Sequence, residues 1–151
     1  MRSLGLPIVL LLYSEAVAAG ANLEVFRQCI SSSVGEDAVL ADVDCSAKAI
    51  RFCTSQMGEP ETAMCLMDLQ QEMTTERKLI LAQLPNVAPP NWTRGDQVYQ
   101  ELLSTIVKGA DQIPCSNGMS AELCAVVSVE ASWIDARFLA RSITLPDYED
   151  E

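Results

Sequence analysis

The chain of 151 residues contains no histidine, few aromatic side chains, and only 10 basic residues against 21 acidic ones. Without histidine, neither a Ser-His-Asp triad nor a cysteine activated by histidine can form. Zinc sites usually combine cysteine with histidine or use cysteines about two to four residues apart, and neither pattern occurs. The glycines form no phosphate-cradling motif. We therefore expect a protein without enzymatic activity, metal or cofactor.

One acidic pair keeps a catalytic alternative open. Glu72 and Glu76 are spaced so that both carboxylates share one face of an expected helix. Glycosidases use two carboxylates as acid and base. Carboxylates at this spacing more often form a solvated helix face, and we expect that role here.

Residues 1–21 have the pattern of a secretory signal peptide. Arg2 precedes an apolar run from Leu4 to Tyr13, and small residues at 16–18 and 19–21 offer cleavage sites. The apolar run is shorter than the ~20 residues that a membrane-spanning helix needs. We expect a periplasmic or secreted protein without stable membrane insertion.

Six cysteines follow the signal segment, at Cys29, Cys45, Cys53, Cys65, Cys115 and Cys124. An even number of cysteines in an exported chain predicts a set of three disulfides. The sequence alone does not choose among the many possible pairings. Proximity along the chain favours pairing of the first with the second, the third with the fourth, and the fifth with the sixth.

Apolar residues recur at helical spacing, and no pair of strands with a hairpin turn is recognisable. Asp42 or Asp44 is expected to cap the second helix, while Gly58 and Pro60 separate it from the third. The expected helices cover residues 22–33, 42–57, 60–84, 96–108 and 120–142. We predict an all-α, disulfide-linked bundle organised around a long helical hairpin, as one domain over 22–146 with an acidic tail at 147–151.

The helical spacing also predicts which side chains face the core. For the third helix these are Leu66, Leu69, Met73, Ile80 and Leu84, and for the fifth they are Leu123, Val127, Ile134 and Phe138. A group of methionines, Met57, Met64, Met67 and Met73, is typical either of an adaptable binding surface or of core filling, and we expect core filling. Trp92, in a proline-rich loop, is expected to cover the core.

The net charge of −11 disfavours contact with nucleic acid or anionic membranes and favours a cationic partner. Residues 22–76 contain ten acidic and three basic side chains, and the last five residues add four acids. The candidate contact residues are Glu59 and Glu61, at the turn between the second and third helices, together with the acidic tail. The alternative is that the acidity only keeps an exported protein soluble.

The cysteine framework from Cys45 to Cys53, followed by Glu61–Cys65 at the start of a long helix, resembles that of the LprI-type lysozyme inhibitor N-terminal domain family. Glu130, Trp133 and Arg137 stand where that family has a Gln-x-x-Trp-x-x-x-Arg-Asp signature, with the glutamine and the aspartate replaced. The resemblance implies a small exported helical protein that binds a lysozyme, and many lysozymes are strongly cationic.

Two other functions are consistent with the sequence. Exported, acidic, helical chains with six cysteines include insect odorant-binding proteins, and the eight residues between Cys115 and Cys124 are similar to their last spacing. Seven residues separate Cys45 from Cys53, where those proteins have a shorter gap. The alternatives are therefore a carrier of small hydrophobic ligands and a structural envelope protein without a ligand.

Overall fold

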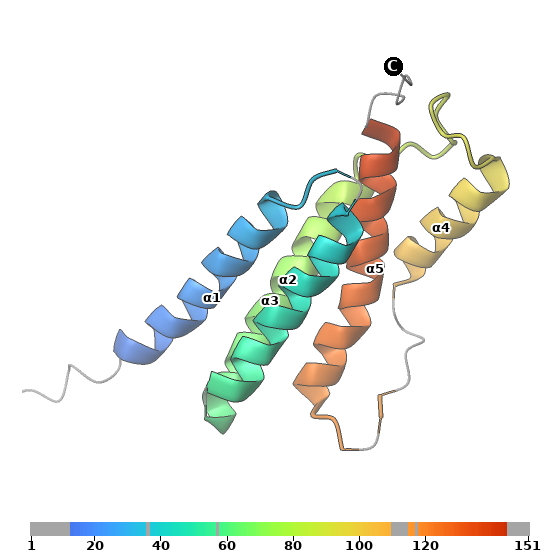
Figure 1. Ribbon diagram of the computed structural model, residues 1–151. Helices are drawn as coiled ribbons and strands as arrows, with labels where there is room; N and C mark the ends of the chain where they lie inside the picture. The colour runs from blue at the N-terminus through green and yellow to red at the C-terminus, as the bar shows by residue number, and fades with distance from the viewer. Residues whose placement is uncertain (1–12, 36, 57, 110–114, 117, 145–151) are drawn as a thin grey trace, which may run out of the picture.

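The computed structural model describes residues 13–35, 37–56, 58–109, 115–116 and 118–144. Within these ranges the chain forms helices and no strands, which confirms the prediction of an all-α, disulfide-linked fold. The helices are α1 (Tyr13–Ser31), α2 (Ala38–Gln56), α3 (Glu59–Leu81), α4 (Asp96–Lys108) and α5 (Ala121–Thr144). In Figure 1, α1, α2, α3 and α5 run alongside one another, and α4 lies beside α5. The acidic tail lies outside the described residues.

The helix α1 begins at Tyr13, so it includes the end of the predicted signal segment and both expected cleavage sites. Residues 1–12 lie outside the described part of the chain. Beyond the cleavage sites, α1 packs into the bundle through Phe26 and Ile30, which are 1% and 7% exposed. None of the helices within the described residues is long and apolar enough to cross a membrane.

The expected hairpin of α2 and α3 is present, with a turn at Gly58 and Pro60 near the start of α3. The helix α5 is as long as α3, because no proline or glycine interrupts the chain between Ala121 and Thr144. These two long helices lie against each other along the bundle (Figure 1). The pair α3–α5 therefore forms the axis against which the remaining helices pack.

The core consists of two clusters that share α3 and α5. One cluster joins α1, α2, α3 and α5, and its large buried side chains are Phe26, Leu66, Leu69, Met73, Val126 and Trp133. The other cluster places α4 and the preceding loop against the far ends of α3 and α5, through Leu84, Trp92, Tyr99, Ile106, Ala136 and Leu139. Because both clusters use the same two helices, the described chain is one continuous packing unit.

The predicted core-facing residues agree with the structure on α3 but not on α5. On α3 the expected stripe is largely correct, since Leu66, Leu69 and Met73 are buried. On α5 the expected stripe is wrong: the buried residues are Val126, Val129, Trp133, Ala136 and Leu139. The helix carries apolar side chains on several sides, so periodicity alone did not identify the face that packs inward. The expected Leu123 and Ile134 only flank the core.

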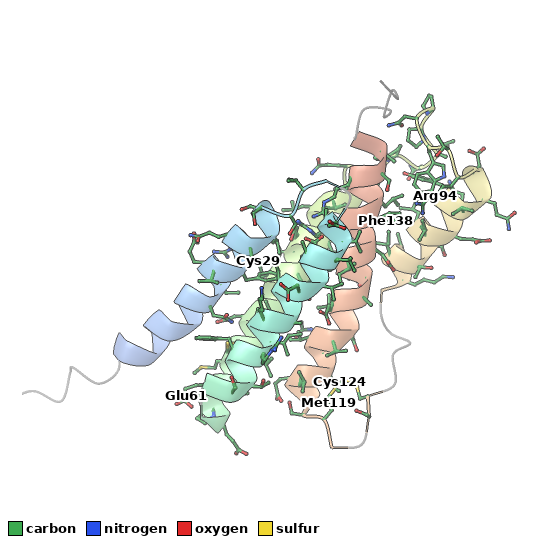
Figure 2. The ribbon with its side chains drawn as sticks, in the orientation of Figure 1. Cys29, Glu61, Arg94, Met119, Cys124 and Phe138 are labelled. Carbon is green, nitrogen blue, oxygen red and sulfur yellow. A yellow bond between two sulfur atoms is a disulfide. The ribbon has the colours of Figure 1, made fainter. Side chains whose placement is uncertain are left out.

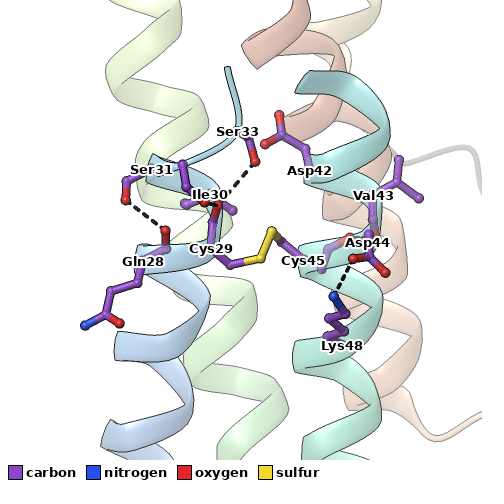
Figure 3. The surroundings of a disulfide bond; sticks show 12 residues. Gln28, Cys29, Ile30, Ser31, Ser33, Asp42, Val43, Asp44, Cys45 and Lys48 are labelled. Atoms are coloured by element: carbon purple, nitrogen blue, oxygen red, sulfur yellow. Dashed lines mark hydrogen bonds and ion pairs between the residues drawn. A yellow bond between two sulfur atoms is a disulfide. The ribbon is translucent and has the colours of Figure 1, made fainter. Parts of the chain in front are cut away.

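The second helix begins earlier than expected, at Ala38. Asp42 and Asp44 are therefore residues of the helix interior and cap nothing. They differ sharply, because Asp42 is fully buried whereas Asp44 forms an exposed pair with Lys48 along one helix face (Figure 3). An aspartate within a helix and away from water requires partners from other elements.

The three disulfides join the cysteines that are nearest neighbours along the chain. Cys29–Cys45 links α1 to α2, with the two Cα atoms 5.8 Å apart (Figure 3). Cys53–Cys65 clamps the α2–α3 hairpin at its turn, and Cys115–Cys124 ties the segment before α5 to the first turns of that helix. All six cysteines are used. Each bridge restricts the unfolded chain and so stabilises this small domain.

The proline-rich loop before α4 is held down by its aromatic residue, as expected. Trp92 is 8% exposed and packs edge-to-face on Tyr99, with ring centroids 5.6 Å apart. The guanidinium of Arg94 lies over the ring of Phe138 at 5.1 Å, which joins the loop to α5 (Figure 2). Of the methionines expected to fill the core, Met73 does so, whereas the expectation is wrong for Met64 and Met67, which are more than half exposed. Met57 lies outside the described residues.

Candidate functional site: an acidic cleft beside two disulfides

A cluster of four buried or half-buried charges links α2, α3 and α5. The carboxylate of Asp42 accepts hydrogen bonds from Arg137 Nε at 2.8 Å and from Arg141 Nη1 at 2.6 Å. Arg137 also pairs with Glu76 through Nη1 and donates from Nη2 to the carbonyl oxygen of Ile30 at 2.8 Å. Two carboxylates thus balance two guanidiniums, which is the condition for burying such charges.

The indole of Trp133 completes this cluster. Its Nε1–H donates to Glu76 Oε2 at 2.7 Å, and the guanidinium of Arg137 lies 5.3 Å from the ring centroid. Phe26 of α1 packs on the ring at a centroid distance of 5.6 Å. The cluster therefore fixes how α1, α2, α3 and α5 meet. This arrangement is structural, because every member is engaged by another element of the bundle.

The expected solvated face of Glu72 and Glu76 is wrong, because both carboxylates are engaged by other helices and play different parts. Glu76 is held by Arg137 and Trp133, as above, whereas Glu72 forms a two-pronged ion pair with Arg27 of α1, with both N···O distances at 2.7 Å. The hydrogen bond from Arg27 lowers the pKa of Glu72. This pair accordingly stabilises the fold above the ordinary carboxylate pKa and loses its effect as the pH falls through the lowered value.

Asp135 of α5 is half-buried, and burial raises the pKa of its carboxyl group. A raised pKa means that the folded chain binds this proton more readily than the unfolded chain, so ionised Asp135 destabilises the fold at neutral pH. We expect Asp135→Asn to raise the melting temperature at pH 7. The gain should shrink as the pH falls toward about 3.9, the ordinary aspartate pKa.

Thermal unfolding followed by circular dichroism at pH 7 and pH 4 measures this effect. Asp68→Asn, at an exposed position of α3, removes the same charge and provides the control. An equal rise in melting temperature for both variants would contradict the assignment to burial.

The hollow with the clearest polar chemistry lies where the α2–α3 turn meets the start of α5. It has a volume of about 420 Å³. Its walls are formed by Thr54, Glu59, Thr62, Ala63, Leu66, Ser120 and Glu122. We call this hollow the acidic cleft. Figure 2 shows Glu61, Met119 and Cys124 at the same end of the bundle.

The lining of the acidic cleft is one-sided in charge. Among the described residues, the lining contains two carboxylates and three hydroxyl groups, and no basic side chain. Glu59 is exposed and Glu122 is half-buried, and both lie in the first turn of their helices. Carboxylates at these positions also favour the helix dipoles. The hydroxyls and carboxylates together present acceptors suited to an ammonium or guanidinium group.

The two predicted contact residues lie in different places relative to the cleft. Glu59 lines the cleft. Glu61 instead folds back over the start of α3, since its Oε2 lies 2.9 Å from where a side chain at Gly58 would begin. Sequence reasoning missed Glu122 and Ser120 as cleft residues. Ser120 was expected to open α5, and its Oγ does accept a hydrogen bond from the Leu123 amide at 3.1 Å.

A second, smaller hollow lies between α1 and α2, beside Cys29–Cys45. Its volume is about 210 Å³, and its lining is almost entirely apolar, with Val25, Phe26, Ala49 and Phe52 as its main side chains. We call it the apolar groove. Lys48 and Asn22 provide its polar edge. Within the described residues, no group of acidic side chains and cysteines is arranged to hold a metal ion.

These features define a class: an all-α protein with three disulfides, a buried ionic cluster and an acidic cleft at one end of its bundle. Neither a family model, nor a curated protein, nor a solved structure matches the chain.

Proposed function

We propose that the protein is an exported, non-enzymatic binding protein that holds a cationic protein partner, such as a lysozyme, at the acidic cleft. The observation that carries the proposal is the cleft itself, where Glu59 and Glu122 line a hollow of about 420 Å³ and no basic side chain is among the described lining residues. Its size is within the range of about 300–1,000 Å³ typical of small-molecule pockets, which leaves room for a single side chain of a partner. A lysine or arginine side chain of the partner would enter the cleft and be held by the carboxylates and hydroxyls.

Three further observations support the proposal. The disulfides fit an oxidising compartment, where export would place the chain. The basic residues of the bundle are partly neutralised, since Arg137 and Arg141 pair internally and Arg27 pairs with Glu72. Each of these pairs also engages a carboxylate, so the surplus of 21 acidic over 10 basic residues remains and sets the sign of the field that steers a cationic partner.

The test is binding of the oxidised protein to a panel of cationic lysozymes, with lytic activity recorded alongside. We expect Glu59→Gln combined with Glu122→Gln to weaken binding by at least about tenfold. A charge-assisted hydrogen bond contributes about 1.5–3 kcal/mol, and about 1.4 kcal/mol corresponds to a tenfold change in affinity. Calorimetry at physiological salt measures the difference.

Asp96→Asn combined with Glu101→Gln provides the matched control, because it removes the same charge from exposed positions of α4. This control should change the affinity by less than about twofold at physiological salt, where the field of remote charges is screened beyond about 8 Å. Equal losses for the two double variants would reduce the interaction to general charge attraction and contradict a role for the cleft.

The apolar groove favours a second function, a carrier of small hydrophobic ligands. Its lining of Val25, Phe26, Ala49 and Phe52 would take an aliphatic chain or a single ring. A ligand that binds only the folded state raises the melting temperature. We expect a lipophilic ligand that occupies the apolar groove to raise the melting temperature of the wild type. Phe52→Ala should abolish this rise. A panel of fatty acids and terpenes that leaves the melting temperature unchanged would argue against a carrier.

A further inference from the structure

The acidic cleft lies between two segments that disulfides close. Its residues Thr54, Glu59, Thr62 and Ala63 fall within the segment closed by Cys53–Cys65, and Leu66 follows directly. Ser120 and Glu122 fall within the segment closed by Cys115–Cys124. Each of the two bridges thus closes the segment that supplies one wall of the cleft.

The two bridges differ in their access to solvent. Cys53 and Cys65 are 0% and 2% exposed, so their sulfur atoms are shielded by the core. Cys115 is exposed, and Cys124 is 9% exposed. The third bridge, Cys29–Cys45, has one buried cysteine and one half-buried cysteine. Because thiol–disulfide exchange requires a thiolate to reach a sulfur atom, Cys115–Cys124 is the bridge most open to attack.

The accessible bridge closes the segment that contains the cleft residue Ser120. Ser120 precedes α5 and accepts the Leu123 amide, and the turn before it is closed by a hydrogen bond from the Met119 amide to the Ser116 carbonyl at 3.2 Å. Gly118, at a φ of 95°, makes this turn possible. Cys115–Cys124 ties the segment that contains this turn to the first turns of α5. Opening the bridge removes that covalent tether and leaves the Ser120 wall held only by the local hydrogen bonds to Ser120 and Ser116.

We propose that the Cys115–Cys124 disulfide is a redox switch of the acidic cleft, which binds its cationic partner only while the bridge is closed. The inference rests on the proposed function. It implies that the protein becomes competent to bind in an oxidising compartment and loses that competence on exposure to a dithiol reductant.

The opening step balances as an ordinary dithiol exchange. One thiolate of the reductant attacks Cys115 Sγ, the S–S bond breaks, and Cys124 leaves as a thiolate that takes up a proton. The second thiol of the reductant, as its thiolate, then displaces Cys115, which is likewise protonated. Two electrons pass to the protein, and the reductant ends as a disulfide.

Stepwise reduction with dithiothreitol, followed by alkylation and peptide mass mapping, tests the accessibility of the bridge. We expect Cys115 and Cys124 to be labelled at least about tenfold faster than the four remaining cysteines, because their bridge alone has an exposed sulfur-bearing residue. Labelling of Cys53–Cys65 or Cys29–Cys45 at the same rate would overturn the inference.

Binding to a cationic lysozyme tests the switch itself. Cys115→Ser combined with Cys124→Ser should lower the affinity by at least about tenfold without loss of helix content, an effect equivalent to about 1.4 kcal/mol. Cys29→Ser combined with Cys45→Ser removes a bridge away from the cleft and should leave the affinity within about twofold. Unchanged affinity for the first double variant would overturn the switch.

Hydrogen exchange separates failure of the switch from failure of the proposed function. If the oxidised protein binds no cationic protein, the proposed function fails. Selective opening of Cys115–Cys124 should still accelerate exchange of the Leu123 and Cys124 amides, which bond to Ser120, by at least about tenfold. Unchanged exchange at these amides would show that the bridge does not control the cleft wall.

Discussion

Asp42→Ala should destabilise the folded protein by about 3–5 kcal/mol, the usual cost of breaking a buried ion pair from one side. The Asp42 carboxylate is fully buried and is shared by the guanidiniums of Arg137 and Arg141, whose side chains are 12% and 21% exposed. Its removal leaves an excess of positive charge inside the bundle. Urea unfolding of the oxidised protein measures the loss, which is a large share of the roughly 5–15 kcal/mol that stabilises a typical domain.

Asp44→Ala is the matched control, two residues further along α2. Asp44 pairs with Lys48 at the surface, where the two side chains are 57% and 64% exposed. Exposed pairs of this kind contribute about 0.3–0.5 kcal/mol, so the control should unfold close to the wild type. A similar midpoint for both variants would mean that Asp42 is not the buried centre of the charge cluster.

Trp133→Ala should cost about 3–5 kcal/mol, as large-to-small substitutions of buried aromatic residues do. The Trp133 side chain is fully buried between Phe26 and Arg137, and its indole N–H bonds to Glu76. Its loss leaves a cavity at the meeting point of α1, α3 and α5 and withdraws a hydrogen bond from the Glu76 carboxylate. The unfolding midpoint in urea should fall with little change in the slope of the transition.

Trp133→Phe separates the two contributions. It keeps most of the aromatic volume and removes the donor to Glu76, whose hydrogen bond contributes about 1.5–3 kcal/mol because the acceptor is charged. We expect a loss clearly smaller than that of Trp133→Ala. Equal losses for the two variants would assign the whole effect to the hydrogen bond and none to packing.

The sequence predicted the features that local chemistry determines. Helical periodicity identified the buried face of α3, since Leu66, Leu69 and Met73 form a single buried stripe, although Met64 and Met67 are exposed on other sides of the helix. Chain proximity identified the disulfide pairs, because short helix-to-helix connections bring neighbouring cysteines together.

The features that escaped prediction depend on partners far apart in the sequence. Asp42 was expected to cap a helix, and nothing near it reveals that Arg137 and Arg141 will meet it across the bundle. On α5, apolar residues surround the helix, so the inward position of Trp133 follows only from the packing of α3 and α1. A buried carboxylate is unexpected on hydrophobicity alone.

The sequence identified only one of the two acidic residues that line the acidic cleft. Glu59 stood out because it is an acidic residue beside an exposed turn. Glu122 lies more than sixty residues later, in the first turn of a different helix, where an acid is usual for helix stability alone. Only the packing of α5 against α3 brings the two carboxylates to one hollow.

The central claim is that the acidic cleft holds a cationic protein. Its most direct test is the affinity of the oxidised wild type and of the Glu59→Gln, Glu122→Gln double variant for a cationic lysozyme at physiological salt. We expect the wild type to bind and to inhibit lysis, and the variant to bind at least about tenfold more weakly. Equal affinities, or no binding by the oxidised wild type to any member of the panel, would contradict it.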